Sequence, residues 1–290
     1  MARTRAIRKR MVAVRTIRRI TKAMQMIATA KFTASLHRAR ATAPYSQKIH
    51  RLVLEVAAAA GDVSHPLIDG PTESPGRELL LAITSDRGMC GAYNSNVLRA
   101  AMDQLASLRR RSVEFDLETS GKKAMRFFRF QGVAVAQAHS IGDRPDYDQV
   151  EPIGRRFIEA FRSGRYDAVR VAYMRFESNT RQVPKVLTLL PLKPEAAAAE
   201  AAGPQAVYEF SPSSEALLDD LLPLAVKVTL FQAFLDAAVS EQIMRMVAMK
   251  AATENAGELS RTLTRRFNRA RQSQITTELT EIMGGVAALE

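Results

Sequence analysis

The last stretch of the chain, from about Ser213 to Glu290, carries apolar residues at spacings of mostly four and three. They are Leu217, Leu221, Leu224, Val228, Phe231, Leu235, Ala238, Met246, Met249, Ala256, Leu259, Leu263, Phe267 and Ala270. This pattern predicts one long helix with a coiled-coil seam, about 110 Å in length. Because Pro223 has no N–H to donate, we expect it to be the first residue of the long helix or a kink after a short lead-in. A helix this long needs a partner helix of matching length.

The first 60 residues supply that partner. Their apolar positions fall within an arc of about 140° on a helical wheel, next to an arc of basic residues. The apolar positions are Ile7, Met11, Val14, Ile17, Met24 and Ala28. We therefore expect a helix from near Thr4 to about Ala60, with a bend at Pro44. The predicted fold is an α/β insertion on a long all-α antiparallel two-helix coiled coil, formed by residues 1–60 and 213–290.

The middle of the chain alternates between strand patterns and helix patterns after a Pro- and Gly-containing linker at 61–76. Strands are expected at 78–84, 112–118, 133–138 and 168–176, with an edge or hairpin strand at 186–191. Helices are expected at 94–111, 122–130 and 149–162. Alternation of this kind predicts a Rossmann-like α/β domain over residues 77–192 with a largely parallel sheet. Residues 193–212 form an Ala-rich linker of low complexity, to which no structure is assigned.

Charge is distributed unevenly. The formal net charge is +12, yet the chain has fourteen Lys and Arg and no Asp or Glu before Glu55, so the remainder carries about −2. A helix with this charge requires an acidic neighbour: a protein surface, anionic lipid or nucleic acid. Nucleic acid fits least, because no aromatic residue precedes Phe32 to stack on bases. No apolar run approaches the roughly 20 residues that span a bilayer, so no membrane insertion is expected.

Two loops of the α/β segment resemble phosphate-binding loops, and neither has the full pattern. Gly88 and Gly91 lack the G-x-G-x-x-G spacing. Gly121 and Lys122 resemble the end of a P-loop, but Asp116 stands where its first glycine belongs and Lys123 replaces the magnesium-binding hydroxyl. The four histidines have no metal-ligand spacing. We therefore expect no catalytic residue, no cofactor and no metal, although an α/β enzyme and a basic coiled-coil adaptor stay open as alternatives.

Four sequence stretches carry a specific resemblance. They are ITKAM at 20–24, TSDRGMCGAYN at 84–94, RMVAMKAATENAG at 245–257 and ARQSQITTELTEI at 270–282. In this order they closely resemble the gamma subunits of the rotary (F-type) ATP synthases, and the resemblance covers nearly the whole chain. It implies a non-catalytic central rotor shaft, which transmits torque between the membrane ion-driven rotor ring and three catalytic beta subunits so that ATP synthesis or hydrolysis is coupled to ion translocation.

The resemblance also implies partners and a location. The partners are the hexameric ring of alpha and beta subunits, the epsilon subunit and the membrane rotor ring. The location is peripheral, at the cytoplasmic face of the inner (plasma) membrane of a bacterium. The resemblance leaves open whether protons or sodium ions drive the complex.

Individual positions match family positions with known roles. Met24 corresponds to the position that faces the catch loop of a beta subunit, and Cys90 lies in the neck loop beside that region. The positions that correspond to contacts between shaft and ring are Arg245, Arg271, Gln272, Thr276 and Glu278. Ile282, Met283 and Val286 correspond to the bearing tip. Gln25 stands where the family commonly has Glu, and Leu36-His37 replaces a more basic pair, so the geometry of the grip stays open.

Overall fold

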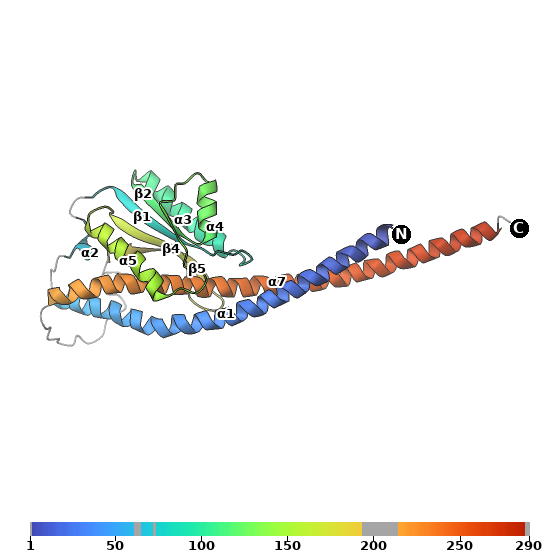
Figure 1. Cartoon of the computed structure of the whole chain (residues 1–290), viewed down its shortest axis with the longest axis horizontal. Coiled ribbons are helices and arrows are strands. Elements are labelled where there is room, and N and C mark those ends of the chain that lie inside the picture. Colours follow the sequence, from blue (N-terminus) through green and yellow to red (C-terminus); the bar gives the residue numbers. More distant parts are fainter. Residues whose placement is uncertain (1, 61–64, 72–73, 193–213, 288–290) are drawn as a thin grey trace. The chain divides into compact units, whose positions relative to one another are not determined.

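The computed structural model describes residues 2–60, 65–71, 74–192 and 214–287. The chain divides into two units, residues 1–29 with 245–290 (unit 1) and residues 30–244 (unit 2). The helices are α1 (Ala2–Ala60), α2 (Pro66–Asp69), α3 (Tyr93–Arg110), α4 (Lys122–Phe130), α5 (Tyr147–Arg162) and α7 (Ser214–Ala287) (Figure 1). The strands are β1 (Arg77–Ile83), β2 (Glu114–Ser120), β3 (Gln137–His139), β4 (Ala168–Phe176) and β5 (Gln182–Leu190).

The two long helices pair in an antiparallel manner within each unit. In unit 1 the Thr4 hydroxyl donates to Gln274 Oε1 at 3.1 Å and the Thr253 hydroxyl donates to Thr21 Oγ1 at 2.8 Å. Numbers that rise along α1 therefore fall along α7. In unit 2 His50 Nε2 lies 2.8 Å from Thr229 Oγ1, again in antiparallel order. The expected coiled coil of the terminal segments is confirmed.

Both prolines of these helices lie inside them. Helix α7 begins at Ser214, nine positions before Pro223, so Pro223 is not its first residue and the lead-in is longer than one turn. Helix α1 continues through Pro44. Each proline removes one backbone N–H from the helical ladder. Helix continuity is retained because both segments are held by tertiary packing and not by local propensity alone.

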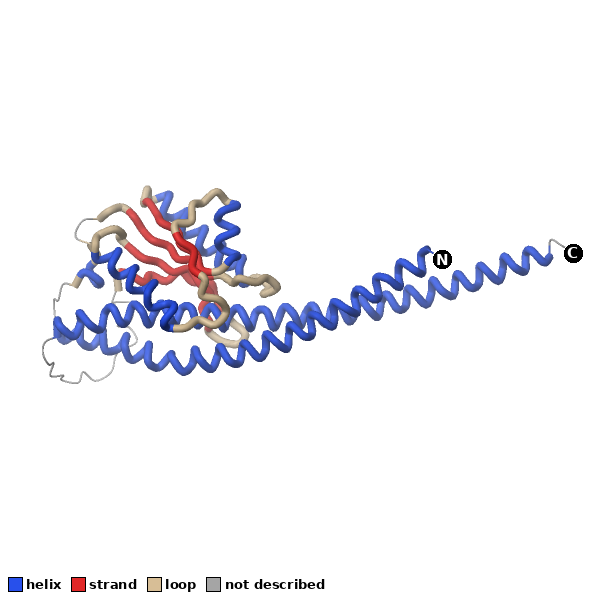
Figure 2. The backbone as a smooth tube through the Cα atoms, viewed as in Figure 1, coloured by secondary structure: helices blue, strands red, loops and turns tan. Residues whose placement is uncertain are grey.

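The sheet of unit 2 has the order β3-β2-β1-β4-β5 (Figure 2). Strand β1 pairs in parallel with β2 and β4, β2 pairs in parallel with β3, and β4 pairs antiparallel with β5. This is the strand order of Rossmann-like sheets with a hairpin at one edge. The central β1 is buried from Glu78 to Ile83, as expected for a strand covered on both faces.

Two sequence expectations for the α/β domain need correction. The third strand is Gln137–His139 and not 133–138. Val133 precedes the strand and packs into the core, and only residues 137–139 pair with β2. The linker at 61–76 contains the short helix α2, whose first turn is capped when His65 Nδ1 accepts the Leu67 N–H at 3.0 Å. Strand β5 confirms the expected hairpin partner and begins four residues earlier than predicted.

The two faces of the sheet have separate cores. Helices α3 and α4 cover one face, where Leu105, Leu117 and Phe128 are buried. Helix α5 and the unit 2 portions of α1 and α7 cover the other, where Phe157 and Leu222 are buried. In this region α7 packs against α1, α5 and the sheet at once. Leu218, Leu222, Ala225 and Val226 are therefore buried, whereas the predicted Leu217, Leu221 and Leu224 are only partly buried.

By length and composition alone, helix α7 is long and apolar enough to cross a membrane. An 18-residue window within residues 216–285 is apolar enough, and 61% of that window is buried inside the structure. The expectation that no stretch of the chain is apolar enough to span a membrane is therefore wrong. The apolar character of the window is explained by the multiple packing partners of α7 in unit 2.

Candidate functional site

The coil of unit 1 has a narrow seam. Its buried residues on α1 are Met11, Val14, Thr21 and Ala28, and those on α7 are Arg245, Met249, Ala256 and Leu263. The seven-residue steps within each set are typical of a coiled coil. A four-three repeat from Val14 continues to positions 18 and 21, so Ile17 lies one position off the seam and is 52% exposed. Leu259 is 49% exposed for the same reason. The prediction that Ile17 and Leu259 lie in the seam is therefore wrong.

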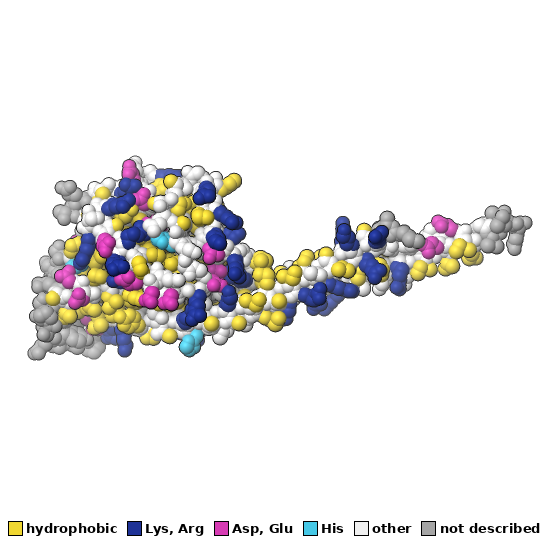
Figure 3. Space-filling model, viewed as in Figure 1, with side chains coloured by type: hydrophobic (Ala, Val, Ile, Leu, Met, Phe, Trp, Pro, Cys, Tyr) yellow, Lys and Arg dark blue, Asp and Glu magenta, His cyan; other side chains and the backbone are white. Residues whose placement is uncertain are grey.

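Unit 1 carries nearly all of the net charge. Its two segments contain sixteen Lys and Arg against five Asp and Glu, and the nine cations of the α1 segment have no acidic residue among them. Lys and Arg side chains gather along this coil in Figure 3. Among the side chains that the structure describes, no cation from Arg5 to Lys22 forms an ion pair. The surface therefore presents uncompensated positive charge to any partner.

A shallow groove of about 800 Å³ lies along this charged surface. Four cations line it, together with hydroxyl groups and short apolar side chains. The lining residues are Val12, Arg15, Thr16, Arg18, Arg19, Lys22, Ala23, Met26 and Thr253. The groove combines hydrogen-bond donors for an anion with apolar surface beside them, which suits an acidic segment that also carries apolar side chains.

The residues expected to contact partners lie in different settings. Met24 is half-buried, beside the groove residue Ala23, and Arg245 is buried in α7. Arg271, Gln272, Thr276 and Glu278 are exposed. The Thr276 hydroxyl donates to Gln272 O at 3.0 Å, and Glu278 Oε1 accepts from Gln274 Nε2 at 2.8 Å. Their contacts with a partner stay predictions.

The end of α7 carries an exposed apolar stripe. The last cross-helix hydrogen bond of the described coil joins Thr4 to Gln274, and every described side chain from Ile275 to Gly285 is exposed. Ile282 is 64% exposed and Met283 is 72% exposed, and both follow Ile275 and Leu279 on the same side of the helix. Val286 lies in the helix, but its side chain is outside the described part. Such a stripe marks a surface that a partner covers.

The loop after β1 places Cys90 inside the domain. Cys90 is 2% exposed and packs against Tyr93, Val97 and Met174. Asn94 Nδ2 lies 3.1 Å from Cys90 Sγ and 2.8 Å from Ser85 Oγ, which ties the loop to α3. The neighbouring Met89 is at the surface instead, 57% exposed at a φ of +62°. Sequence reasoning missed Met89, because no local pattern signals this backbone conformation.

The second glycine loop leads into the start of α4, where the expectation of no phosphate site can be compared with the hydrogen bonds of the backbone. Its amide N–H groups already have acceptors: Lys122 donates to Asp86 Oδ1 at 3.0 Å, Lys123 to Ser85 O at 3.2 Å and Ala124 to Thr84 Oγ1 at 2.9 Å. The Asp86 carboxylate thus occupies the helix N-terminus, the place where a nucleotide phosphate binds in related sheets.

Buried acids of the sheet are neutralised by basic partners. Arg156 holds Glu118 with two hydrogen bonds of 2.8 and 2.6 Å, and His139 Nε2 lies 2.7 Å from the same carboxylate. Burial alone would raise the pKa of Glu118, but the hydrogen bonds from His139 and Arg156 outweigh it and lower this pKa. A carboxylate kept ionised in this way joins β2 to α5 and is not a general acid.

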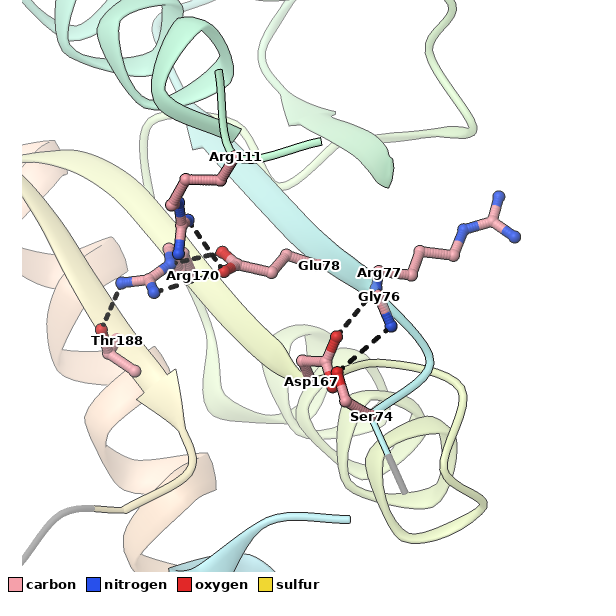
Figure 4. Close-up of polar contacts among 8 residues, drawn as sticks. All are labelled: Ser74, Gly76, Arg77, Glu78, Arg111, Asp167, Arg170 and Thr188. Atoms are coloured by element: carbon pink, nitrogen blue, oxygen red, sulfur yellow. Dashed lines mark hydrogen bonds and ion pairs between the residues drawn. The ribbon is translucent and has the colours of Figure 1, made fainter. Parts of the chain in front are cut away.

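Glu78 of β1 is held in the same way. Arg170 Nε donates to Glu78 Oε2 at 2.6 Å and Arg111 Nη2 donates to Glu78 Oε1 at 3.1 Å, with Thr188 accepting from Arg170 (Figure 4). No group of three or more His, Cys, Asp or Glu that could hold a metal ion occurs among the described residues. The uncompensated positive charge described above lies on the α1 segment of the coil of unit 1.

Comparison with known proteins gives a consistent result. A family profile described as ATP synthase matches residues 3–289. A relative named ATP synthase gamma chain from Rhodopirellula baltica is 41% identical, with 100% of both chains covered. Another of the same name from Desulforudis audaxviator is 39% identical, with 99% of both covered. A chain from the solved Euglena gracilis mitochondrial ATP synthase has a TM-score of 0.68 and 20% identity, covering 99% of this chain and 95% of that one, and it supports the fold.

Proposed function

The chain belongs to the family of ATP synthase gamma chains and is a non-catalytic central-stalk subunit, and we propose that the coil of unit 1 is the surface by which it grips the catalytic ring. The observation that carries this proposal is the acid-free cationic face of α1 with its groove. Exposed ion pairs contribute only about 0–1 kcal/mol each. A grip built from several of them can therefore be made and released at each step of rotation.

The shaft couples rotation to catalysis through unequal contacts. The gamma chain transmits torque between the membrane rotor ring and the three catalytic beta subunits. A single coil has different faces, so the three beta subunits meet different side chains at any one angle. Each catalytic site then shifts toward the conformation that its own contact favours. The coil of unit 1 has such an inequality, because its α1 segment has nine cations and no acidic residue whereas its α7 segment has seven cations and five acidic residues.

We assign the contacts as follows. The alpha and beta subunits surround the coil, with Met24 and the groove against an acidic catch loop of a beta subunit and the tip residues Ile282, Met283 and Val286 in an apolar bearing. Arg271, Gln272, Thr276 and Glu278 lie between these two contacts. The epsilon subunit and the membrane ring bind elsewhere on the chain. The complex is membrane-associated, and we place this subunit at the cytoplasmic face of a bacterial inner membrane.

Native mass spectrometry of the tagged chain, isolated from cells under gentle conditions, tests the assignment. We expect one assembly that contains alpha, beta and epsilon subunits in addition to this chain. A basic coiled-coil adaptor would instead carry lipid or nucleic acid without those subunits, and that result would contradict the proposal. A variant with Arg15, Arg19 and Lys22 replaced by glutamine alters the groove without altering the seam, and we expect it to recover less of the alpha and beta subunits.

The purified chain alone is expected to hydrolyse no ATP. The physical reason is that the amide groups at the start of α4 already donate to Asp86, Ser85 and Thr84, which leaves no place for a phosphate. A phosphate-release assay measures this directly. Hydrolysis that follows the chain through purification and disappears in a Lys122→Ala variant would contradict the prediction.

Replacing Met24 with lysine is expected to lower the ratio of ion pumping to ATP hydrolysis in the assembled complex by about two- to five-fold. The change adds a charge at a half-buried position beside the groove, and a disturbance of about 1 kcal/mol corresponds to this factor. Pumping into sealed vesicles and hydrolysis are measured on one preparation. Met24→Leu, which conserves volume and charge, should retain the wild-type ratio; an equal loss in both variants would point to packing alone.

A further inference from the structure

The seam of unit 1 contains an arginine at a core position. The four-three repeat that joins Val14 to Thr21 passes through residue 18, and this residue is Arg18. A charged side chain at such a position is normally unfavourable, because the facing helix would bury its charge. Arg18 is nevertheless an exposed residue and lines the groove together with Thr253 of α7.

Gly257 of α7 explains how Arg18 is accommodated. A Cβ atom built at Gly257 would lie 3.6 Å from Arg18 Nε, 3.7 Å from Arg18 Cζ and 3.9 Å from Arg18 Nη2. These nearly equal distances mean that the plane of the guanidinium lies against the glycine. A larger side chain at this position would extend into the space that the guanidinium occupies.

Gly257 has no other evident role in the helix. It lies within α7 and has no left-handed backbone conformation, so an alanine there would be favoured by about 1 kcal/mol on helix propensity. Among the described glycines, it is the one whose missing side chain leaves room for a cation of the groove. A methyl group would still fit beside the guanidinium, so the placement of Arg18 requires a small residue at position 257, and glycine meets this requirement.

We propose that Gly257 is a positioning residue that holds the Arg18 guanidinium across the seam as a fixed, two-pronged donor for a partner carboxylate. The inference rests on the proposed function and names the group that the groove receives. Arginine binds carboxylates through two parallel N–H donors, a geometry that lysine does not reproduce. Packing on Gly257 fixes the fork in advance, so less side-chain entropy is lost when the partner binds.

The test uses the assembled complex in sealed vesicles and measures the ratio of ion pumping, with proton and sodium uptake both followed, to ATP hydrolysis. Arg18→Gln and Gly257→Leu are each expected to lower this ratio by about two- to five-fold, the factor for one exposed charged contact. The double variant should have the same ratio as Arg18→Gln, because both changes remove the same contact between the positioned Arg18 guanidinium and the partner carboxylate. Arg18→Lys should lose as much as Arg18→Gln, since it keeps the charge without the fork.

Two controls separate positioning from stability. Gly257→Ala should keep the wild-type ratio, because a Cβ at 3.6–3.9 Å makes ordinary contact with Arg18. Asn255→Leu places the same leucine at an exposed position of α7 and should also be neutral. Additive losses in the double variant, or a wild-type ratio in Arg18→Lys, would overturn the inference; Arg18→Lys decides the matter even if the leucine variant does not assemble. If the wild-type chain joins no alpha and beta subunits, the proposed function itself fails.

Discussion

Gly121→Ala is expected to destabilise the α/β domain by about 4 kcal/mol. Gly121 has a φ of +93°, and a Cβ atom there would lie 2.1 Å from the backbone oxygen of Thr84. The left-handed conformation alone costs an L-residue about 1–2 kcal/mol, and the clash is with backbone that cannot rotate away. Moving Thr84 would also disturb its hydroxyl, which accepts the N–H of Ala124. Urea denaturation of the full chain, followed by circular dichroism, measures the loss.

Gly132→Ala is the matched control for this change. Gly132 has a φ of +69°, but nothing lies within 4 Å of a Cβ built on it. We expect a loss of about 1 kcal/mol from the backbone conformation alone. Equal losses in the two variants would show that the close approach of the loop after β1 to the start of α4 contributes nothing.

Asp236→Asn is expected to stabilise unit 2 by up to about 3 kcal/mol at pH 8 and by little below pH 4. Burial raises the pKa of Asp236 to about 6, and the hydrogen bond from Gln232 opposes this only partly. The folded state therefore favours the neutral acid, and the wild type loses stability as the pH rises from about 4 to about 6. A shift of about two pKa units corresponds to about 3 kcal/mol, and asparagine avoids this penalty.

The measurement is the free energy of unfolding of both chains across this pH range. Asp148→Asn makes the same charge change at an exposed position of α5 and should alter stability little at any pH. A gain in Asp236→Asn that persists unchanged at pH 3.5 would contradict the role of ionisation. It would indicate a better packing of asparagine against the amide of Phe176 instead.

The sequence predicted the elements where pattern and packing agree. Helix α4 and strand β4 have the expected bounds. Gly121 marks the start of α4, and a nearly continuous apolar run marks β4. The third strand was misplaced, since Val133 is apolar for a reason of packing and not of pairing. Ile17 was misassigned because a wheel of 100° per residue tolerates positions that the 3.5-residue repeat of a coil excludes.

Only part of the candidate site could be predicted from the sequence. The absence of acid before Glu55 indicated the cationic face, since charge is a property of the sequence itself. The burial of Cys90, the exposure of Met89 and the contact of Arg18 with Gly257 depend on tertiary arrangement or on positive φ. No spacing rule connects residues 18 and 257 before the register of the two helices is known.

The described end of α7 beyond Gln274 has a thermodynamic consequence. A lone segment of about 12–15 residues is a marginal helix in water, because nucleation is unfavourable and no packing offsets it. Residues 275–287 make no described cross-helix hydrogen bond with α1, so their order is supported only by continuity with the coil below. Binding by another chain that encloses this segment would therefore order it. The conformational entropy lost on ordering would reduce the free energy of binding.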